Sequence, residues 1–232
     1  MTKLGFPAFV ALCVALQSAP AAAQSERAGE TVRVQPDVYQ RQALLPSTLG
    51  VGDDVYRNAK VMTERYGSTE IRFEDDTLLT IGPSSEVVID DYVYSPSSGA
   101  GEMSVRMGKG VLRLISGRVP AEGVRLRTPV ATIGIRGTSF WIDSTDIVEV
   151  DIWVEEGTVL ATPDQGDQTF ELVAPVFATC SIFRCTERDG PAVPGAFPSA
   201  PTSPFSVDTV EDGRDDPGGT DSESSEGENS GF

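Results

Sequence analysis

The sequence predicts an all-β protein built from antiparallel hairpins, because hydrophobic and polar residues alternate along most of its central part. The clearest run covers residues 148–156, where valine and isoleucine share one face while Trp153 and most of the acidic residues share the other. Such alternation is typical of strands with one buried face and one solvated face. No segment offers a useful amphipathic helix, since residues 57–66 come closest and lack a consistent apolar stripe.

Three stretches have the composition of tight turns between strands, at residues 73–79, 107–112 and 154–160. In each, an apolar residue is followed three positions later by Asp or Gly and then by a new apolar run. Gly and Asp tolerate the positive φ that tight turns require. We therefore predict three hairpins, whose strands form a sandwich, a roll or a short solenoid; the pattern does not separate these three architectures.

The N-terminus has the features of a signal peptide over residues 1–23. Lys3 precedes an apolar stretch of 13 residues, and Ala21 and Ala23 satisfy the small-x-small rule for cleavage before Gln24. An uncleaved anchor is the alternative, but the apolar stretch is short for a bilayer span. We therefore expect a periplasmic or secreted protein without stable membrane insertion.

The rest of the chain divides by composition into four parts. Residues 24–48 form an N-terminal segment, of which residues 24–41 are polar and weakly patterned, and we expect these to be partly ordered at best. Residues 49–178 carry the regular alternation of a β domain. Residues 179–206 form a cysteine loop and a Pro-rich linker, and residues 207–232 are acidic and too poor in apolar groups to order themselves.

Cysteine usage agrees with export. Cys13 is lost with the signal peptide, which leaves Cys180 and Cys185 to form a local disulfide in an oxidising compartment. A redox-active dithiol is the alternative, but four residues separate the two cysteines and the segment has little helical character.

Charge and composition exclude several classes of function. The chain has 35 Asp and Glu against 18 Lys and Arg, so its formal charge is −17, which disfavours nucleic acid as a partner. It contains no His, which excludes a Ser-His-Asp or Cys-His mechanism. The carboxylate pairs at 75–76, 90–91 and 155–156 are adjacent in sequence, so on a strand their side chains point to opposite faces. We therefore expect no enzyme, no catalytic residue, no cofactor and no metal site.

Residues 56–162 resemble the FecR domain, the periplasmic sensing module of bacterial envelope regulators. The most specific part is RTPVATIGIRGTSF at residues 127–140, which is similar to the family's threonine–proline strand and its arginine–glycine–threonine–x–phenylalanine turn. Four further segments match in the expected order, at residues 63–80, 82–89, 105–113 and 150–159.

The resemblance implies a binding or interaction module in envelope sensing, signal transduction or assembly, with another envelope protein as partner. The family's sigma-factor regulators carry a cytoplasmic N-terminal segment and a membrane span, whereas here the signal sequence starts near residue 3. We therefore do not expect direct control of a sigma factor. The alternative is an exported carbohydrate-binding or carbohydrate-active β protein, and a third possibility is a structural envelope component, whose first sign would be self-association. The sequence does not indicate the oligomeric state.

The most distinctive candidate site consists of Arg136, Gly137 and Thr138, because here a charged residue lies inside an apolar run. One interpretation is an anion or carboxylate clamp presented by a glycine turn. The other, which we favour, is structural: Arg136 pairs with an internal carboxylate, for example in residues 75–76.

Trp153 shares its strand face with Glu149, Asp151 and Glu155. An exposed Trp among acidic residues would be a platform for a carbohydrate or a partner protein. The opposite interpretation is that this face is covered and Trp153 belongs to the core, and the sequence does not decide between the two.

Overall fold

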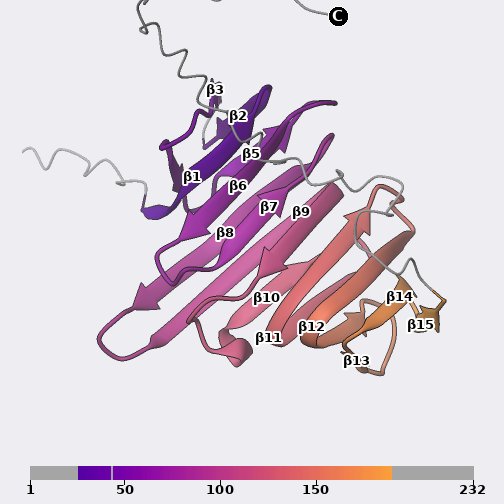
Figure 1. Cartoon of the computed structure of the whole chain (residues 1–232). Coiled ribbons are helices and arrows are strands. Elements are labelled where there is room, and N and C mark those ends of the chain that lie inside the picture. The colour runs from indigo at the N-terminus through magenta and orange to yellow at the C-terminus, as the bar shows by residue number, and fades with distance from the viewer. Residues whose placement is uncertain (1–25, 43, 190–232) are drawn as a thin grey trace, which may run out of the picture.

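The computed structural model describes residues 26–42 and 44–189, and nearly all of its regular structure is β (Figure 1). The all-β prediction is confirmed. The elements are β1 (Arg27–Gln35), β2 (Val38–Arg41), β3 (Pro46–Thr48), β4 (Asp54–Tyr56), β5 (Lys60–Thr63), β6 (Ser68–Phe73), β7 (Leu78–Ile81), β8 (Glu86–Ser95), β9 (Ala100–Ile115), a 3-10 turn (Ala121–Gly123), β10 (Val124–Arg127), β11 (Ala131–Ser144), β12 (Glu149–Pro163), β13 (Phe170–Val173), β14 (Val176–Ser181) and β15 (Cys185–Arg188).

Three predicted segments lie outside the described residues: the signal peptide at 1–23, most of the Pro-rich linker and the acidic tail at 207–232. Within the described part of the chain, no helix is long and apolar enough to cross a membrane.

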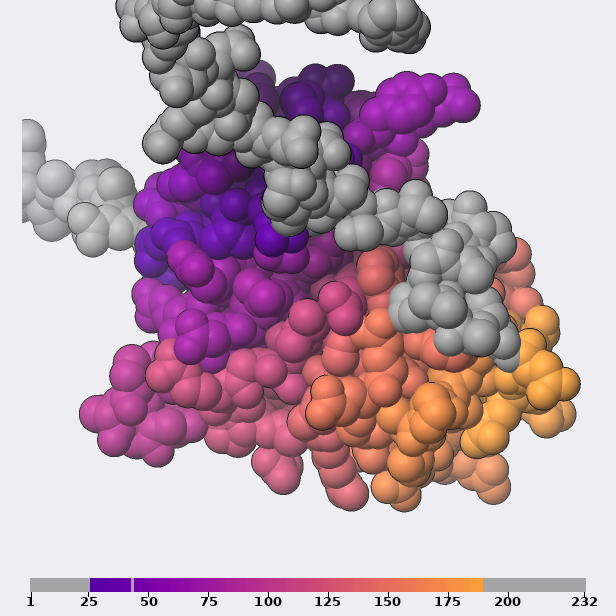
Figure 2. Space-filling model, in the orientation of Figure 1, coloured from indigo at the N-terminus to yellow at the C-terminus, as the bar shows by residue number. Residues whose placement is uncertain are grey.

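The strands form one hydrogen-bonded sheet of 15 strands, with the N-terminal strands at one end of the molecule and the C-terminal strands at the other (Figure 2). The sheet is mixed, because β10 pairs in parallel with β9 while the other pairings among the described strands are antiparallel. It consists of two blocks that share β9, β11 and β12. The first block has the order β3-β2-β5-β8-β9-β10-β11-β12-β13, and the second has the order β4-β1-β6-β7-β9-β11-β12-β14-β15.

Strand β9 passes from the first block to the second at Gly110, whose φ is +103°. Before this glycine the odd-numbered side chains are buried, as at Met103 and Val105; after it the even-numbered ones are buried, as at Leu112 and Leu114. A β-bulge inserts one extra residue and therefore changes which alternate side chains face the core. The bulge lets one strand serve both blocks around one hydrophobic core.

The same device recurs in the two other shared strands. In β11 the residues of the main hydrophobic core change from odd (Ile133, Ile135) to even (Phe140, Ile142) across Gly137. In β12 the buried positions change from even to odd at Gly157. Both glycines have positive φ, +56° and +78°. They lie close together, since a Cβ on Gly157 would come within 2.0 Å of the carbonyl oxygen of Gly137.

These bulges correct two of the three predicted hairpins. The turn at residues 73–79 is confirmed, because β6 and β7 pair across it and Asp76 takes a positive φ. Residues 107–112 and 154–160 instead lie inside the continuous strands β9 and β12. The prediction was wrong because a glycine with positive φ serves a bulge as well as a turn.

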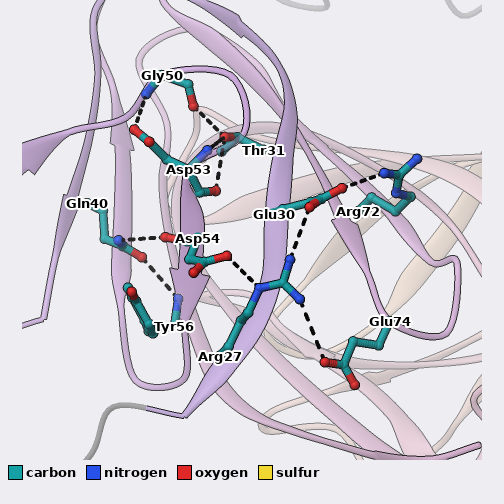
Figure 3. A network of polar contacts seen from close by, with 10 residues as sticks. All are labelled: Arg27, Glu30, Thr31, Gln40, Gly50, Asp53, Asp54, Tyr56, Arg72 and Glu74. Atoms are coloured by element: carbon teal, nitrogen blue, oxygen red, sulfur yellow. Dashed lines mark hydrogen bonds and ion pairs between the residues drawn. The ribbon is translucent and has the colours of Figure 1, made fainter.

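The expectation of weak order in residues 24–41 is also wrong for the described residues, since β1 lies between β4 and β6. Polar contacts rather than large apolar side chains hold β1 there (Figure 3). Arg27 donates a hydrogen bond to Asp54 at 2.5 Å and pairs with Glu30, which in turn pairs with Arg72 on β6. Because Asp54 and Arg72 are distant in sequence from β1, hydrophobic periodicity does not reveal this strand.

Candidate functional site

A row of large side chains crosses the outer face of the second block. The strand registers place five residues directly opposite one another in succession: Arg113, Trp141, Trp153, Phe177 and Arg188. They come from β9, β11, β12, β14 and β15. Because directly opposed residues in an antiparallel pair lie on the same face, these five side chains form one continuous stripe.

The Arg113 end of the stripe is closed by internal contacts. The Arg113 guanidinium lies 5.4 Å from the centre of the Trp141 ring, and Trp141 is only 8% exposed. Glu155 accepts hydrogen bonds from Arg113 at 2.6 Å, from the Ser139 hydroxyl at 2.6 Å and from the Trp141 indole N–H at 3.1 Å. These groups satisfy each other, which leaves this end of the stripe without an evident ligand site.

The same contacts set the ionisation of Glu155. Burial alone would raise the pKa of this carboxyl, but the hydrogen bonds from Ser139, Arg113 and Trp141 and the charge of Arg113 outweigh burial, so the pKa is lowered. Glu155 is therefore a charged partner of Arg113 at neutral pH.

The other end of the stripe borders a groove of about 830 Å³. Trp153 is half-buried and contacts Phe177, with 6.4 Å between the ring centres. The indole nitrogen of Trp153 has no hydrogen-bond partner among the described residues. The groove is lined by Trp153, Pro175, Val176, Phe177, Glu187, Arg188 and Asp189.

The predicted binding-surface residues do share one face of β12, with different surroundings. Glu149 is exposed near the start of the strand, while Asp151 accepts a hydrogen bond from the Thr179 hydroxyl at 2.6 Å. Glu155 belongs to the closed end with Arg113. Trp153 is neither a fully exposed platform nor an ordinary core residue. It packs against Phe177 and also lines the groove.

Arg136 is not where the favoured structural interpretation placed it. Its side chain is 63% exposed, and its ion-pair partner is Glu171 on β13 at 4.0 Å. Arg136 lies on the outer face of β11, because the odd-numbered residues Ile133 and Ile135 face the core in the part of the strand before Gly137. The carboxylates at 75–76 have other partners, including Arg118, which contacts Asp76 at 2.5 Å.

The match to known proteins agrees with this architecture. The family model described as FecR protein matches residues 59–160, from just before β5 to the second half of β12. We refer to residues 59–160, which match this family model, as the FecR domain. The predicted resemblance is thereby confirmed.

Solved structures give a weaker likeness. Two crystal structures of a candidate anti-sigma factor from Parabacteroides distasonis, at 1.65 Å and 2.50 Å resolution, each align with 56% of this chain at 14% identity and a TM-score of 0.44. The alignment covers 59% of that chain, so it spans somewhat over half of that protein. A comparison with curated proteins gives no match.

The groove lies largely outside the matched FecR domain, since residues 175–189 follow it in sequence. They form the hairpin of β14 and β15, which pairs with the β12 strand of the FecR domain. The predicted disulfide joins Cys180 to Cys185 across this hairpin.

Sequence reasoning identified Trp153 but missed Phe177 and the charged residues at 187–189, because their short segments lack extended alternation. The one sequence signal that pointed to this region was the cysteine pair. Among the residues that the structure describes, no cluster of acidic, Cys or His side chains is arranged to hold a metal ion.

Proposed function

We propose that this protein is an exported, non-enzymatic FecR-domain module that binds another envelope protein in sensing, signal transduction or assembly. The observation that carries the proposal is the groove beside Trp153, built where the β14–β15 hairpin extends the FecR domain. It combines an aromatic floor with charged residues at its rim, the composition that protein-binding surfaces favour. The signal-peptide features of residues 1–23 support a periplasmic or secreted location.

The surroundings of the acidic residues support a binding role rather than catalysis. A general acid that works near neutral pH needs a raised pKa, whereas the pKa of Glu155 is lowered by its partners. The sequence also contains no His, which removes the commonest general base.

Cross-linking in the cells that produce the protein tests the proposal. The tagged full-length protein would be cross-linked after export, and the captured proteins identified by mass spectrometry. We expect one dominant envelope protein, with capture reduced by Trp153→Ala. A matched Tyr66→Ala variant, altered at a 75% exposed aromatic residue away from the groove, should capture as well as the native protein.

Two results would overturn the proposal: turnover of a substrate by the purified protein with no partner captured, or recovery of the protein only in the cytoplasm. Affinity electrophoresis against a panel of polysaccharides tests the carbohydrate alternative. Retardation that Trp153→Ala abolishes would replace the protein partner with a glycan.

A further inference from the structure

Arginine residues gather on the outer face of the first block, where β9, β10 and β11 lie side by side (Figure 1). In the parallel pair of β9 with β10, Arg127 lies directly beside Arg106, and Arg125 lies two residues from Arg127 on the same exposed face. In the antiparallel pair of β10 with β11, Arg125 lies opposite Gly134, so Arg136 is its diagonal neighbour. These four arginines are all exposed, and we call them the arginine cluster.

The described part of the chain neutralises only part of this positive charge. Arg106 pairs with Asp90 on β8, and Arg136 has a carboxylate of β13 at 4.0 Å. Neither Arg125 nor Arg127 has an ion-pair partner among the described residues. Neighbouring strands are about 4.8 Å apart, so the like charges of Arg106 and Arg127 repel each other unless an anion lies over them. The cluster therefore favours an anionic ligand, although the formal charge of the whole chain is −17.

The acidic tail of the chain itself has the complementary charge. Residues 207–232 contain nine Asp and Glu and a single basic residue, Arg214. The described chain ends at Asp189, just after β15, and β15 is four strand spacings from β10, or about 20 Å. The 17 residues between, 190–206, are rich in proline, and a Pro-rich linker of this length spans about 50 Å. The acidic tail can therefore reach the arginine cluster around the edge of the sheet.

We infer that the acidic tail docks on the arginine cluster of the same molecule, with its carboxylates beside Arg125 and Arg127. The linker favours the tail over an external anion, because it holds the tail at an effective concentration on the order of millimolar. Docking shields the arginines from other anions. The cluster lies on the outer face of the first block, whereas the groove beside Trp153 lies on that of the second, so this inference is independent of the proposed partner binding.

Carbodiimide cross-linking of the full exported protein tests the inference, because the reagent joins an amine directly to a carboxylate. Residues 24–232 contain only two lysines, Lys60 and Lys109, so links from an added lysine are easy to assign by peptide mapping. In Arg127→Lys, we expect links from position 127 to the acidic tail. Arg65→Lys is the matched control, because Arg65 is also exposed but lies in the turn between β5 and β6. Its links to the tail should be about tenfold fewer, since it lacks the neighbouring arginines that concentrate the tail.

Charge variants in the Arg127→Lys protein separate docking on the cluster from general attraction. Arg125→Gln should lower the yield of tail links about threefold, as expected when one exposed charge pair is lost. Arg184→Gln removes the same charge from the exposed turn between β14 and β15 and should leave the yield unchanged. Equal yields from positions 127 and 65, or an equal loss in the two charge variants, would overturn the inference.

Cross-linking an equal mixture of isotopically labelled and unlabelled protein shows which molecule supplies the tail. We expect every tail link to join peptides of one isotopic composition, because the tail and the cluster belong to the same molecule. Links of mixed composition would overturn the inference in favour of the tail of a second copy. Absence of tail links at position 127 would also overturn it and leave the arginine cluster to an external anion.

Discussion

Tyr92 and Asp75 form a closed pair in the interior of the FecR domain. The Tyr92 hydroxyl donates a hydrogen bond to the Asp75 carboxylate at 3.1 Å and accepts one from the backbone N–H of Asp75 at 3.0 Å. The same carboxylate accepts hydrogen bonds from the Thr77 hydroxyl at 2.6 Å and from the backbone N–H of Val119 at 3.0 Å. Asp75 therefore joins the β6–β7 turn to β8 and to the segment after β9.

Removal of the Tyr92 hydroxyl should destabilise the domain. Tyr92→Phe leaves the buried backbone N–H of Asp75 without its acceptor and the carboxylate without one donor, which typically costs about 1–3 kcal/mol. Urea unfolding of the purified protein measures the loss. Tyr94→Phe is the control on the same strand, because no hydrogen bond from the Tyr94 hydroxyl to a described residue accompanies its ring contact with Arg118. Equal stability of the two variants would contradict the role of the Tyr92–Asp75 pair.

Glu155 should make stability depend on acidic pH. Its folded-state pKa lies below the ordinary value of 4.5, so its ionised form is favoured in the folded protein. Its stabilising contribution is present above pH 4.5 and is lost as the pH falls through the lowered folded-state pKa. Denaturant unfolding over this acidic range should show a shallower pH dependence for Glu155→Gln than for the native protein. Glu156→Gln, at the exposed neighbour, should retain the native slope.

Gly157 should tolerate no side chain. Its φ is +78°, and a Cβ would lie 2.0 Å from the carbonyl oxygen of Gly137, so Gly157→Ala forces the β11 and β12 bulges apart. We expect a loss above about 3 kcal/mol or failure to fold, measured by thermal unfolding and soluble yield. Gly99→Ala is the control for backbone strain alone, because φ is +67° but nothing lies within 4 Å of its Cβ. That variant should lose only about 1 kcal/mol.

The alternation of hydrophobic residues was sufficient to predict the β class and the buried face of strands such as β10 and β12. It did not predict the path of the sheet, because a glycine that ends a strand and a glycine that bulges within one have the same neighbours in sequence. Gly110 and Gly157 are of the second kind, and long-range pairing decides between the two. The ordered strand β1 was not predicted for a related reason, since Arg27 and Asp54 come into contact only in the folded chain.

The candidate site was predictable only in part. The face of Trp153 followed from strand periodicity, but its contact with Phe177 depends on the register of β12 with β14. The charged rim at residues 187–189 depends on a further register, that of β14 with β15. Arg136 shows the opposite error: its apolar neighbours suggested burial, whereas strand alternation with the buried Ile135 places it on the outer face.

Arg136 should therefore contribute little to stability. Its ion pair with Glu171 is long and well exposed on both sides, and such pairs are worth at most about 1 kcal/mol. Arg136→Met should unfold within about 1 kcal/mol of the native protein in urea, and high salt should remove the difference. A large loss of stability would instead restore a structural role for this arginine. Glu171→Gln should reproduce the effect of Arg136→Met if the pair is the source.

The disulfide should hold the β14–β15 hairpin more than it stabilises the whole fold. Cys180 and Cys185 are five positions apart, and closing so small a loop contributes only about 2 kcal/mol in the chain-entropy description. In Cys180→Ala/Cys185→Ala, we expect faster hydrogen exchange at β14 and β15 and unchanged exchange at β11, because the variant releases the hairpin while the FecR domain stays folded. An equal increase of exchange at β11 would contradict the prediction, because the disulfide would then stabilise the whole fold.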